Sequence, residues 1–277
     1  MRVPDVIPAH EFPLTETLRW LIACKTAFVN GFGGTAAESR EAYQRKTVEL
    51  SQGLEYIFSF DDVQRMILTR RHWLLIQMVV TGNGPSINDL IRAETTERLR
   101  YFEALVQTYT QVQANWSGSE TNLLIADTNV YEHNEDYWDE IDWAKLAKAS
   151  DIRLLIPNVV VRELDKHKRS DRTNKVSDTN SEAVRTRARV STRHLREKFA
   201  KPDDVGSLAK PGATAELLID APGHVALDDP DSEIIDRALA VRWFTQQPVS
   251  IVTGDGNMQF AASSAGLDVI NVYETGH

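Results

Sequence analysis

Cysteine is almost missing from this sequence. Cys24 is the single cysteine among 277 residues, so no internal disulfide can form. Lack of disulfides is typical of proteins in a reducing cytoplasm, and we expect a cytoplasmic location. Cys24 lies within the apolar stretch LRWLIACKTAFV, which predicts a buried packing role for its thiol.

Long hydrophobic runs are also missing. No stretch reaches the about 18 consecutive apolar residues that a transmembrane helix needs, although 42% of the residues are hydrophobic. The opening segment, MRVPDVIPAHEFPLTE, has no apolar core of the kind found in signal peptides. We therefore expect a soluble globular protein with no membrane partner.

Two common kinds of site lack their sequence patterns. There is no GxxxxGK[ST] loop, which argues against P-loop nucleotide hydrolysis. The histidines have no spacing typical of zinc ligands, and we interpret His133, His167 and His194 as surface residues.

Positive charge is scarce overall but concentrated in one segment. The net charge of −9 argues against a nucleic-acid partner. However, residues 162–201 carry 13 Lys and Arg against 6 Asp and Glu, a net of +7, between flanking segments of −5 (121–161) and −9 (202–277). Acidic clusters attract cations and basic segments attract phosphates. This distribution would suit a protein that binds a metal ion and a polyanion at one cleft.

The first part of the chain has helical periodicity. We predict an all-helical N-terminal region, residues 1–115, which could bind a protein partner or mediate homo-oligomerisation. One predicted helix has Asp61 and Asp62 as caps and the apolar positions Val63, Met66, Ile67, Leu74 and Met78; TGNGPS (81–86) ends it. Ser86 starts the next helix, whose apolar stripe is Leu99, Phe102, Leu105, Val106 and Tyr109, and ANWSGSET (114–121) is a predicted linker.

The second part, residues 116–277, alternates strands and helices. Strands are predicted at 122–126, 152–156, 215–220, 249–253 and 267–272. Helices are predicted at 138–150, 181–200, 230–244 and 257–265, and another is predicted to begin at Asn158 as its N-cap. Residues 201–214 are a predicted loop. This alternation indicates an α/β fold with three α/β/α layers around a mostly parallel sheet.

Four acids follow strands or begin helices in this part. Asp127 directly follows strand 122–126, and Asp255 lies two residues beyond strand 249–253. Glu163 and Asp231 lie in the first turns of predicted helices. Because parallel strands bring such positions to one sheet edge, we expect the four carboxylates to converge. Clustered carboxylates repel one another unless a cation neutralises them, and Mg²⁺ and Mn²⁺ prefer oxygen ligands. The pattern predicts a metal centre that could support phosphodiester hydrolysis.

Each acid also has an ordinary structural interpretation. Asp229 and Asp231 are common residues at a helix N-terminus, Asp255 lies in the turn-forming segment TGDGN, and Glu163 could be a solvated helix acid. Independent caps have no reason to meet at one edge, so convergence would favour a site.

Four segments resemble the motifs of the PIN domain, a family of metal-dependent nucleases. They are LLIADTNV, IPNVVVRELDKHKRS, DDPDSEII, and VSIVTGDGNM followed by GLDVI, in the family's order across residues 123–272. The resemblance implies RNA hydrolysis with Mg²⁺ or Mn²⁺ held by the catalytic acids Asp127, Glu163, Asp231 and Asp255. It also implies that Thr128 and Asn129 orient Asp127 by hydrogen bonding and that Thr253 has a similar supporting role. Asp229 is a further supporting residue, and Asp228 and Asp229 are alternatives to Asp231 as the ligand.

The basic segment follows the second acid and is predicted to bind the RNA backbone. Arg185, Arg189, Arg193 and Arg196 recur at intervals of four, four and three, so they share one helix face. A salt-bridged, solvated face is the alternative. The predicted RNA-binding residues are Lys166, Lys168, Arg169, Arg172, Arg185, Arg189, Arg193 and Arg196.

We therefore expect an endoribonuclease, with two alternatives left open. One is a catalytically inactive PIN-like protein that binds RNA or acts as a scaffold. The other is the toxin of a toxin–antitoxin pair, although such toxins tend to be a bare PIN domain. A haloacid-dehalogenase-type phosphatase would need an acid two residues after Asp127, where Asn129 stands.

Overall fold

The computed structural model describes residues 1–9, 12–78, 87–116, 121–169, 173–175 and 181–273. Arg172, Ser86 and the segment 81–86 lie outside these residues. The chain divides into two compact units. The helical unit is Pro4–Ser117 with Trp243–Gln246, and the α/β unit is Met1–Val3, Gly118–Arg242 and Gln247–His277.

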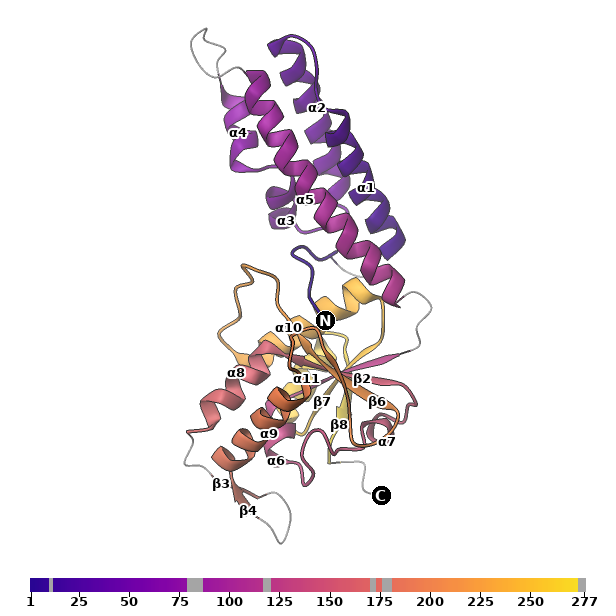
Figure 1. The fold of residues 1–277 in the computed structure, drawn as a ribbon, viewed down its shortest axis with the longest axis vertical. Coiled ribbons are helices and arrows are strands. Elements are labelled where there is room, and N and C mark those ends of the chain that lie inside the picture. Colours follow the sequence, from indigo (N-terminus) through magenta and orange to yellow (C-terminus); the bar gives the residue numbers. More distant parts are fainter. Residues whose placement is uncertain (10–11, 79–86, 117–120, 170–172, 176–180, 274–277) are drawn as a thin grey trace. The chain divides into compact units, whose positions relative to one another are not determined.

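The predicted all-helical character of the N-terminal region is confirmed, and its described residues form five helices. They are α1 (Leu14–Asn30), α2 (Ala36–Leu54), α3 (Phe60–Met66), α4 (Arg70–Gln77) and α5 (Ile87–Trp116). Figure 1 shows α1, α2 and α5 running alongside one another. Their facing sides are apolar, and Leu21, Phe28, Leu54 and Phe102 are buried there.

The prediction of one helix spanning Val63 and Met78 is wrong, because the chain breaks between α3 and α4. The Thr69 side chain accepts a hydrogen bond from the backbone N–H of His72 at 3.1 Å, which starts a new helix. The cap of α3 is also different from the prediction. Ser59, rather than Asp61 or Asp62, caps α3 by accepting a bond from the backbone N–H of Asp62 at 3.2 Å.

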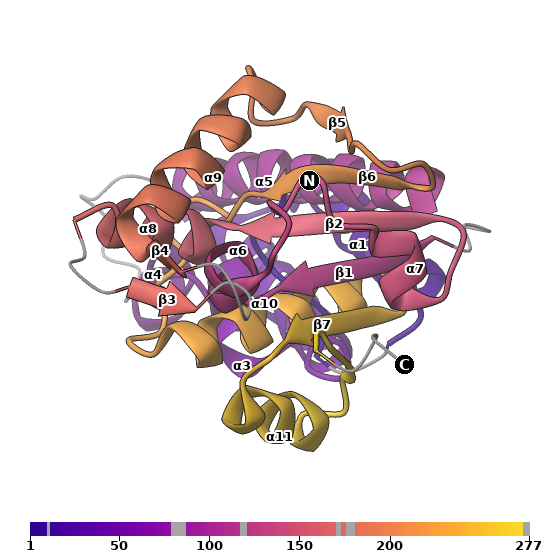
Figure 2. The same cartoon turned by 90° about the horizontal axis from the view of Figure 1, so that it is seen from below.

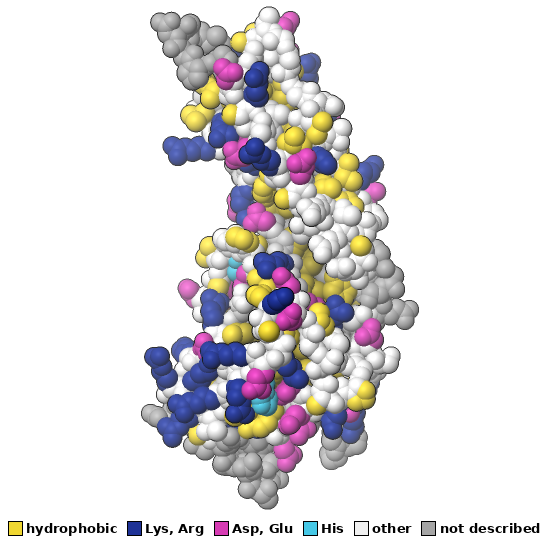
Figure 3. Space-filling model, viewed as in Figure 1, with side chains coloured by type: hydrophobic (Ala, Val, Ile, Leu, Met, Phe, Trp, Pro, Cys, Tyr) yellow, Lys and Arg dark blue, Asp and Glu magenta, His cyan; other side chains and the backbone are white. Residues whose placement is uncertain are grey.

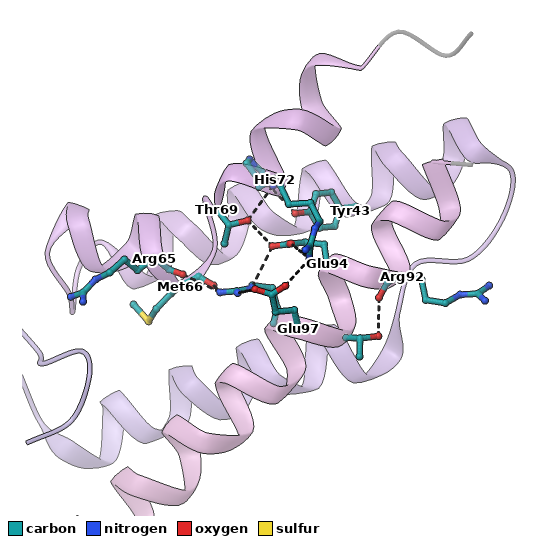
Figure 4. Close-up of polar contacts among 11 residues, drawn as sticks. Tyr43, Arg65, Met66, Thr69, His72, Arg92, Glu94 and Glu97 are labelled. Atoms are coloured by element: carbon teal, nitrogen blue, oxygen red, sulfur yellow. Dashed lines mark hydrogen bonds and ion pairs between the residues drawn. The ribbon is translucent and has the colours of Figure 1, made fainter. Parts of the chain in front are cut away.

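A buried ionic network ties this break to α5 (Figure 4). The Glu94 side chain is 1% exposed and accepts hydrogen bonds from Thr69 Oγ1 at 2.8 Å and Arg71 Nη1 at 3.1 Å. Arg98, which is nearly buried, places Nε 3.4 Å from Glu94 Oε1 and donates to the carbonyl oxygens of residues 65 and 66. Glu94 and Arg98 together therefore join α3, α4 and α5.

Replacing Glu94 with Ala is expected to lower the free energy of unfolding of the helical unit by about 3–5 kcal/mol, because Arg98 would lose its buried carboxylate partner. Urea denaturation followed by far-UV circular dichroism measures this. Glu103 is exposed on the same helix, and Glu103→Ala should cost less than about 0.5 kcal/mol. Equal losses in the two variants would contradict this role of Glu94.

The α/β unit contains a six-stranded sheet in the order β5-β6-β2-β1-β7-β8. The strands are β1 (Asn122–Ala126), β2 (Ile152–Pro157), β5 (Val205–Ser207), β6 (Ala213–Leu218), β7 (Val249–Thr253) and β8 (Asp268–Asn271). Neighbouring strands are parallel except for the antiparallel pair β5–β6. The central strands are mostly apolar and buried, as expected when both faces of a sheet are covered. The predicted α/β fold with a mostly parallel sheet is confirmed.

Helices connect these strands. They are α6 (Thr128–His133), α7 (Trp143–Ala147), α8 (Asn158–His167), α9 (Val184–Lys198), α10 (Pro230–Thr245) and α11 (Gly256–Ser264). A small hairpin of β3 (Thr173–Lys175) and β4 (Ser181–Ala183) precedes α9. In Figure 2 the strands β1 and β2 point toward the side where α6, α8 and α9 lie. The carboxyl ends of the central strands therefore face these helices.

Three predicted elements differ in extent. The helix predicted at 138–150 is limited to α7, because Asp142 Oδ1 caps it at the Lys145 N–H (2.9 Å) and Lys148 ends it with a φ of +53°. The helix predicted at 181–200 begins later, since residues 181–183 form β4. The predicted loop 201–214 contains β5 and the start of β6, which pair with each other.

The predicted cap of α8 is also corrected. Pro157 holds the N-cap position without a side-chain hydrogen bond. Asn158 instead donates from Nδ2 to Asp220 Oδ2 at 3.0 Å, which links α8 to the chain after β6. Among the described helices, none combines the length and apolarity needed to cross a membrane.

Candidate metal centre and nucleic-acid interface

Asp127 is buried at the end of β1, where it caps α6, and its side chain accepts three hydrogen bonds from two residues. Asp127 is 2% exposed. Oδ2 accepts hydrogen bonds from Thr253 Oγ1 and Asn129 Nδ2, each at 3.0 Å, and Oδ1 accepts one from the Asn129 N–H at 3.4 Å. Burial raises the pKa of Asp127 above its ordinary value, while these hydrogen bonds act in the opposite direction. The carboxylate is therefore held in one orientation in a site that disfavours an uncompensated charge.

Glu163 lies in the second turn of α8 and is linked to α6. Its Oε2 accepts a hydrogen bond from Thr128 Oγ1 at 2.7 Å. Thr128 was expected to orient Asp127, but its hydroxyl bonds to Glu163. This contact fixes the position of Glu163 relative to Thr128, the residue that follows Asp127.

Asp255 is both a helix cap and a neighbour of the other acids. Its Oδ1 accepts hydrogen bonds from the backbone N–H groups of Asn257 at 2.7 Å and Met258 at 3.1 Å, which caps α11. Its own N–H donates to Thr253 Oγ1 at 3.0 Å. Thr253 also donates to Asp127, so this one buried threonine positions both Asp127 after β1 and Asp255 after β7.

Asp231 shows that the acids act on one another. Burial, and after it the negative charges of Asp127, Asp229, Asp255 and Glu163, together raise the pKa of Asp231 to about 6. These charges can act together only if the strand ends bring them close in space. Asp127, Glu163 and Asp255 thus lie within electrostatic range of Asp231, although no three of these four described acids place ligand atoms within 4.8 Å of one another.

Asp229 has a different role from Asp231. It is exposed, and its Oδ2 accepts hydrogen bonds from the Ser232 N–H at 2.9 Å and Ser232 Oγ at 2.6 Å. These bonds lower the pKa of Asp229. Asp229 thus caps the first turn of α10, which favours Asp231 as the acid that faces the centre.

A second cluster lies beside α10 and was missed by sequence reasoning. Asp220, His224 and Glu233 place potential ligand atoms within 4.8 Å of one another, so they could hold a metal ion. However, Arg237 already provides positive charge, with Nη1 at 3.7 Å from Asp220 and Nε at 3.8 Å from Glu233. We interpret this cluster as an ionic network.

This network fixes the loop that precedes Asp231. Glu233 is 1% exposed, and its Oε1 lies 2.7 Å from His224 Nε2. Its Oε2 accepts a hydrogen bond from the Leu227 N–H at 2.8 Å. The loop residues at 224 and 227 are thereby attached to α10. No periodic pattern in the sequence signals these contacts.

Two histidines interpreted as surface residues are half-buried and paired. His167 Nδ1 lies 2.7 Å from Glu132 Oε1, and His194 Nδ1 lies 2.7 Å from Asp139 Oδ1. Glu132 is 3% exposed, and burial raises its pKa, although the His167 contact opposes this shift. The Glu132–His167 pair joins α6 to α8, the two helices that carry Asp127's neighbours and Glu163.

Most of the predicted RNA-binding side chains are exposed on α8 and α9. Figure 3 shows Lys and Arg gathered over the part of the α/β unit where these helices lie. Lys168 is half-buried and paired with Asp165, and Arg193 Nε lies 3.8 Å from Glu197 Oε1. The exposed members are Lys166, Arg169, Arg185, Arg189, Arg193 and Arg196. They form what we call the basic face.

Arg187, in contrast, is buried and structural. It is 2% exposed, donates to the carbonyl oxygens of Asn134 and Asp136, and places its guanidinium carbon 4.3 Å from the centre of the Tyr137 ring. Arg187 therefore anchors α9 to the chain after α6, and its neighbours at 185 and 189 are directed outward.

Comparison with known families identifies this part of the chain. Residues 121–273, more than half of the chain, match the PIN domain family. A search of curated proteins gave no match. PIN domains are generally nucleases and typically use divalent metals, in agreement with the acids and the basic face described above. The chain belongs to the PIN domain family.

Proposed function

We propose that this protein is a divalent-metal-dependent ribonuclease that cleaves RNA endonucleolytically. The observation that supports this most is the hydrogen-bonded set at the strand ends, where Thr253 Oγ1 bonds to both Asp127 and the Asp255 N–H and Thr128 Oγ1 bonds to Glu163. We also propose that residues 116–277 form the nuclease domain and that residues 1–115 form a separate helical region.

The four acids suit a hard cation. Asp127, Glu163, Asp231 and Asp255 supply only carboxylate oxygens, the ligands that Mg²⁺ and Mn²⁺ prefer. A bound divalent ion would offset both the burial and the carboxylate repulsion that raise the pKa of Asp231. When bound, such an ion would activate water and stabilise the leaving oxygen of a phosphodiester.

The protein's own residues supply positioning and substrate binding. Thr253 and Asn129 hold Asp127, and Thr128 holds Glu163, so the carboxylates keep their orientation before any ligand arrives. The basic face would bind the RNA backbone beside them through charge.

The basic face predicts a salt-dependent contribution to RNA binding. Arg189→Ala combined with Arg193→Ala should weaken binding and reduce the slope of log affinity against log salt by about 1–2, because each lost phosphate contact removes about 0.7 for single strands. Fluorescence anisotropy over a salt series in EDTA measures this. Arg45 is exposed in the helical unit, and Arg45→Ala should leave the slope unchanged. An unchanged slope in the double variant would contradict the assignment.

Incubation with a mixed panel of RNA and DNA, with Mn²⁺ or with EDTA, tests the proposed activity. Internal cleavage of RNA by the wild type in Mn²⁺, and none in EDTA, is expected. RNA that stays intact in Mn²⁺ would overturn the proposal, as would cleavage of equal rate in EDTA.

A further inference from the structure

An aromatic residue outside the four PIN motifs lies beside the candidate metal centre, next to Thr253 and Asp255. Tyr273 follows β8, and its backbone N–H donates to Asn271 Oδ1 at 2.9 Å. The preceding Val272 N–H donates to the Thr253 carbonyl oxygen at 3.3 Å. The backbone at Tyr273 is therefore attached to the end of β7, at the threonine that holds Asp127.

The Tyr273 ring lies against Gly254, the residue between Thr253 and Asp255. A Cβ atom at Gly254 would lie 2.1 Å from Tyr273 Cε2 and 2.9 Å from Cδ2, far inside van der Waals contact. Only glycine leaves room for the ring at this distance. The ring is thus in direct contact with the loop that carries two residues of the candidate centre.

The same ring remains accessible. Tyr273 is 61% exposed, although a large aromatic side chain gains free energy when its surface is buried. A tyrosine hydroxyl is uncharged at physiological pH, so the side chain does not repel a polyanion. An accessible, neutral aromatic ring beside a phosphodiester-cleaving centre is suited to contact with a nucleobase.

We propose that Tyr273 is a base-stacking subsite that binds one nucleobase of single-stranded nucleic acid next to the cleaved phosphate. This inference rests on the proposed function. Proteins that bind single strands combine a basic surface, which follows the backbone, with aromatic rings on which bases stack. The basic face and Tyr273 supply these two parts. Paired bases inside a duplex are already stacked on their neighbours, so the subsite selects single-stranded segments.

Binding without cleavage tests this subsite separately from catalysis. The full chain is titrated in EDTA against a fluorescein-labelled single-stranded RNA, the same strand with abasic nucleotides, and its duplex. Tyr273→Ala should weaken binding to the intact strand by roughly 5- to 150-fold, the range measured for loss of one base–aromatic stack. Tyr273→Phe should bind within about twofold of wild type, because the ring is retained.

The abasic strand and a matched variant provide the controls. The two proteins, wild type and Tyr273→Ala, should have the same affinity for the abasic strand, and they should also have the same affinity for the duplex. Tyr56 is 82% exposed in the helical unit, and Tyr56→Ala should bind as the wild type does.

Equal binding of the intact strand by wild type and Tyr273→Ala would overturn the subsite, and so would an equal loss on the abasic strand. If the wild type binds the strands but does not cut RNA in Mn²⁺, the proposed activity fails, while the binding data still decide the subsite. Absence of any RNA binding by the wild type would overturn both.

Discussion

Asp127→Asn is expected to reduce RNA cleavage by at least about a thousandfold while leaving the fold intact. Loss of one carboxylate removes a central ligand charge, and several kcal/mol of transition-state stabilisation correspond to about three powers of ten in rate. The new side chain keeps the size of aspartate, and its carbonyl oxygen can still accept the Thr253 hydroxyl. The amide nitrogen cannot accept the Asn129 N–H that Oδ1 accepts at 3.4 Å, but removal of a charge that burial disfavours offsets this loss, so the melting temperature of the metal-free protein should change little.

Initial cleavage rates of a labelled RNA in Mn²⁺ measure this effect, and circular dichroism checks the fold. Asp268→Asn is the matched control, because Asp268 is exposed at the start of β8, far along the strand from its carboxyl end. The control should retain full activity. Full activity of a correctly folded Asp127→Asn variant would contradict the assignment of Asp127.

The raised pKa of Asp231 predicts that metal affinity depends on pH. With a pKa of about 6, Asp231 is mostly protonated at pH 5 and mostly ionised at pH 7, so the apparent Mn²⁺ affinity should fall about tenfold between pH 7 and pH 5. A raised folded-state pKa also means that the contribution of Asp231 to stability is present below its ordinary value of 3.8 and is lost as pH rises through about 6. At pH 7 the metal-free protein is therefore destabilised by its own carboxylates, and Mn²⁺ should relieve this.

Melting temperatures at graded Mn²⁺ concentrations, at pH 5 and pH 7, measure both effects. Asp231→Asn should raise the melting temperature of the metal-free protein at pH 7 by about 2–4 °C, since about 1 kcal/mol shifts a domain of this size by that amount. The variant should also show a much smaller rise with Mn²⁺. The Mn²⁺ concentration that gives half of the rise in melting temperature should be higher at pH 5 than at pH 7. If the wild type needs the same concentration at both pH values, Asp231 is not a ligand.

The elements that carry the acids could be predicted because their signals are local. The strands before Asp127 and Asp255 are short apolar runs, and Pro230 marks the start of α10. The edge strand β5 could not be predicted, because its three residues, VGS, are partly exposed and depend on pairing with β6. The early start predicted for α9 has a similar cause, since pairing with β3 sets residues 181–183 as a strand.

The partners of the acids depend on contacts between distant parts of the chain, which periodicity cannot reveal. Glu132 meets His167 only because α6 packs beside α8, and Glu233 meets His224 only because the loop folds back on α10. Tyr273 had one indirect signal, the glycine at position 254, but the ring that requires it is known only from the fold.

The central claim is that the four acids form one divalent-metal centre. Calorimetric titration of Mn²⁺ into the full chain at pH 7 tests it most directly, with Asp127→Asn and Asp268→Asn measured in parallel. We predict saturable binding by the wild type and Asp268→Asn, and its loss in Asp127→Asn. The account would be contradicted if the wild type bound no Mn²⁺ at millimolar concentration, or if folded Asp127→Asn bound it as tightly as the wild type.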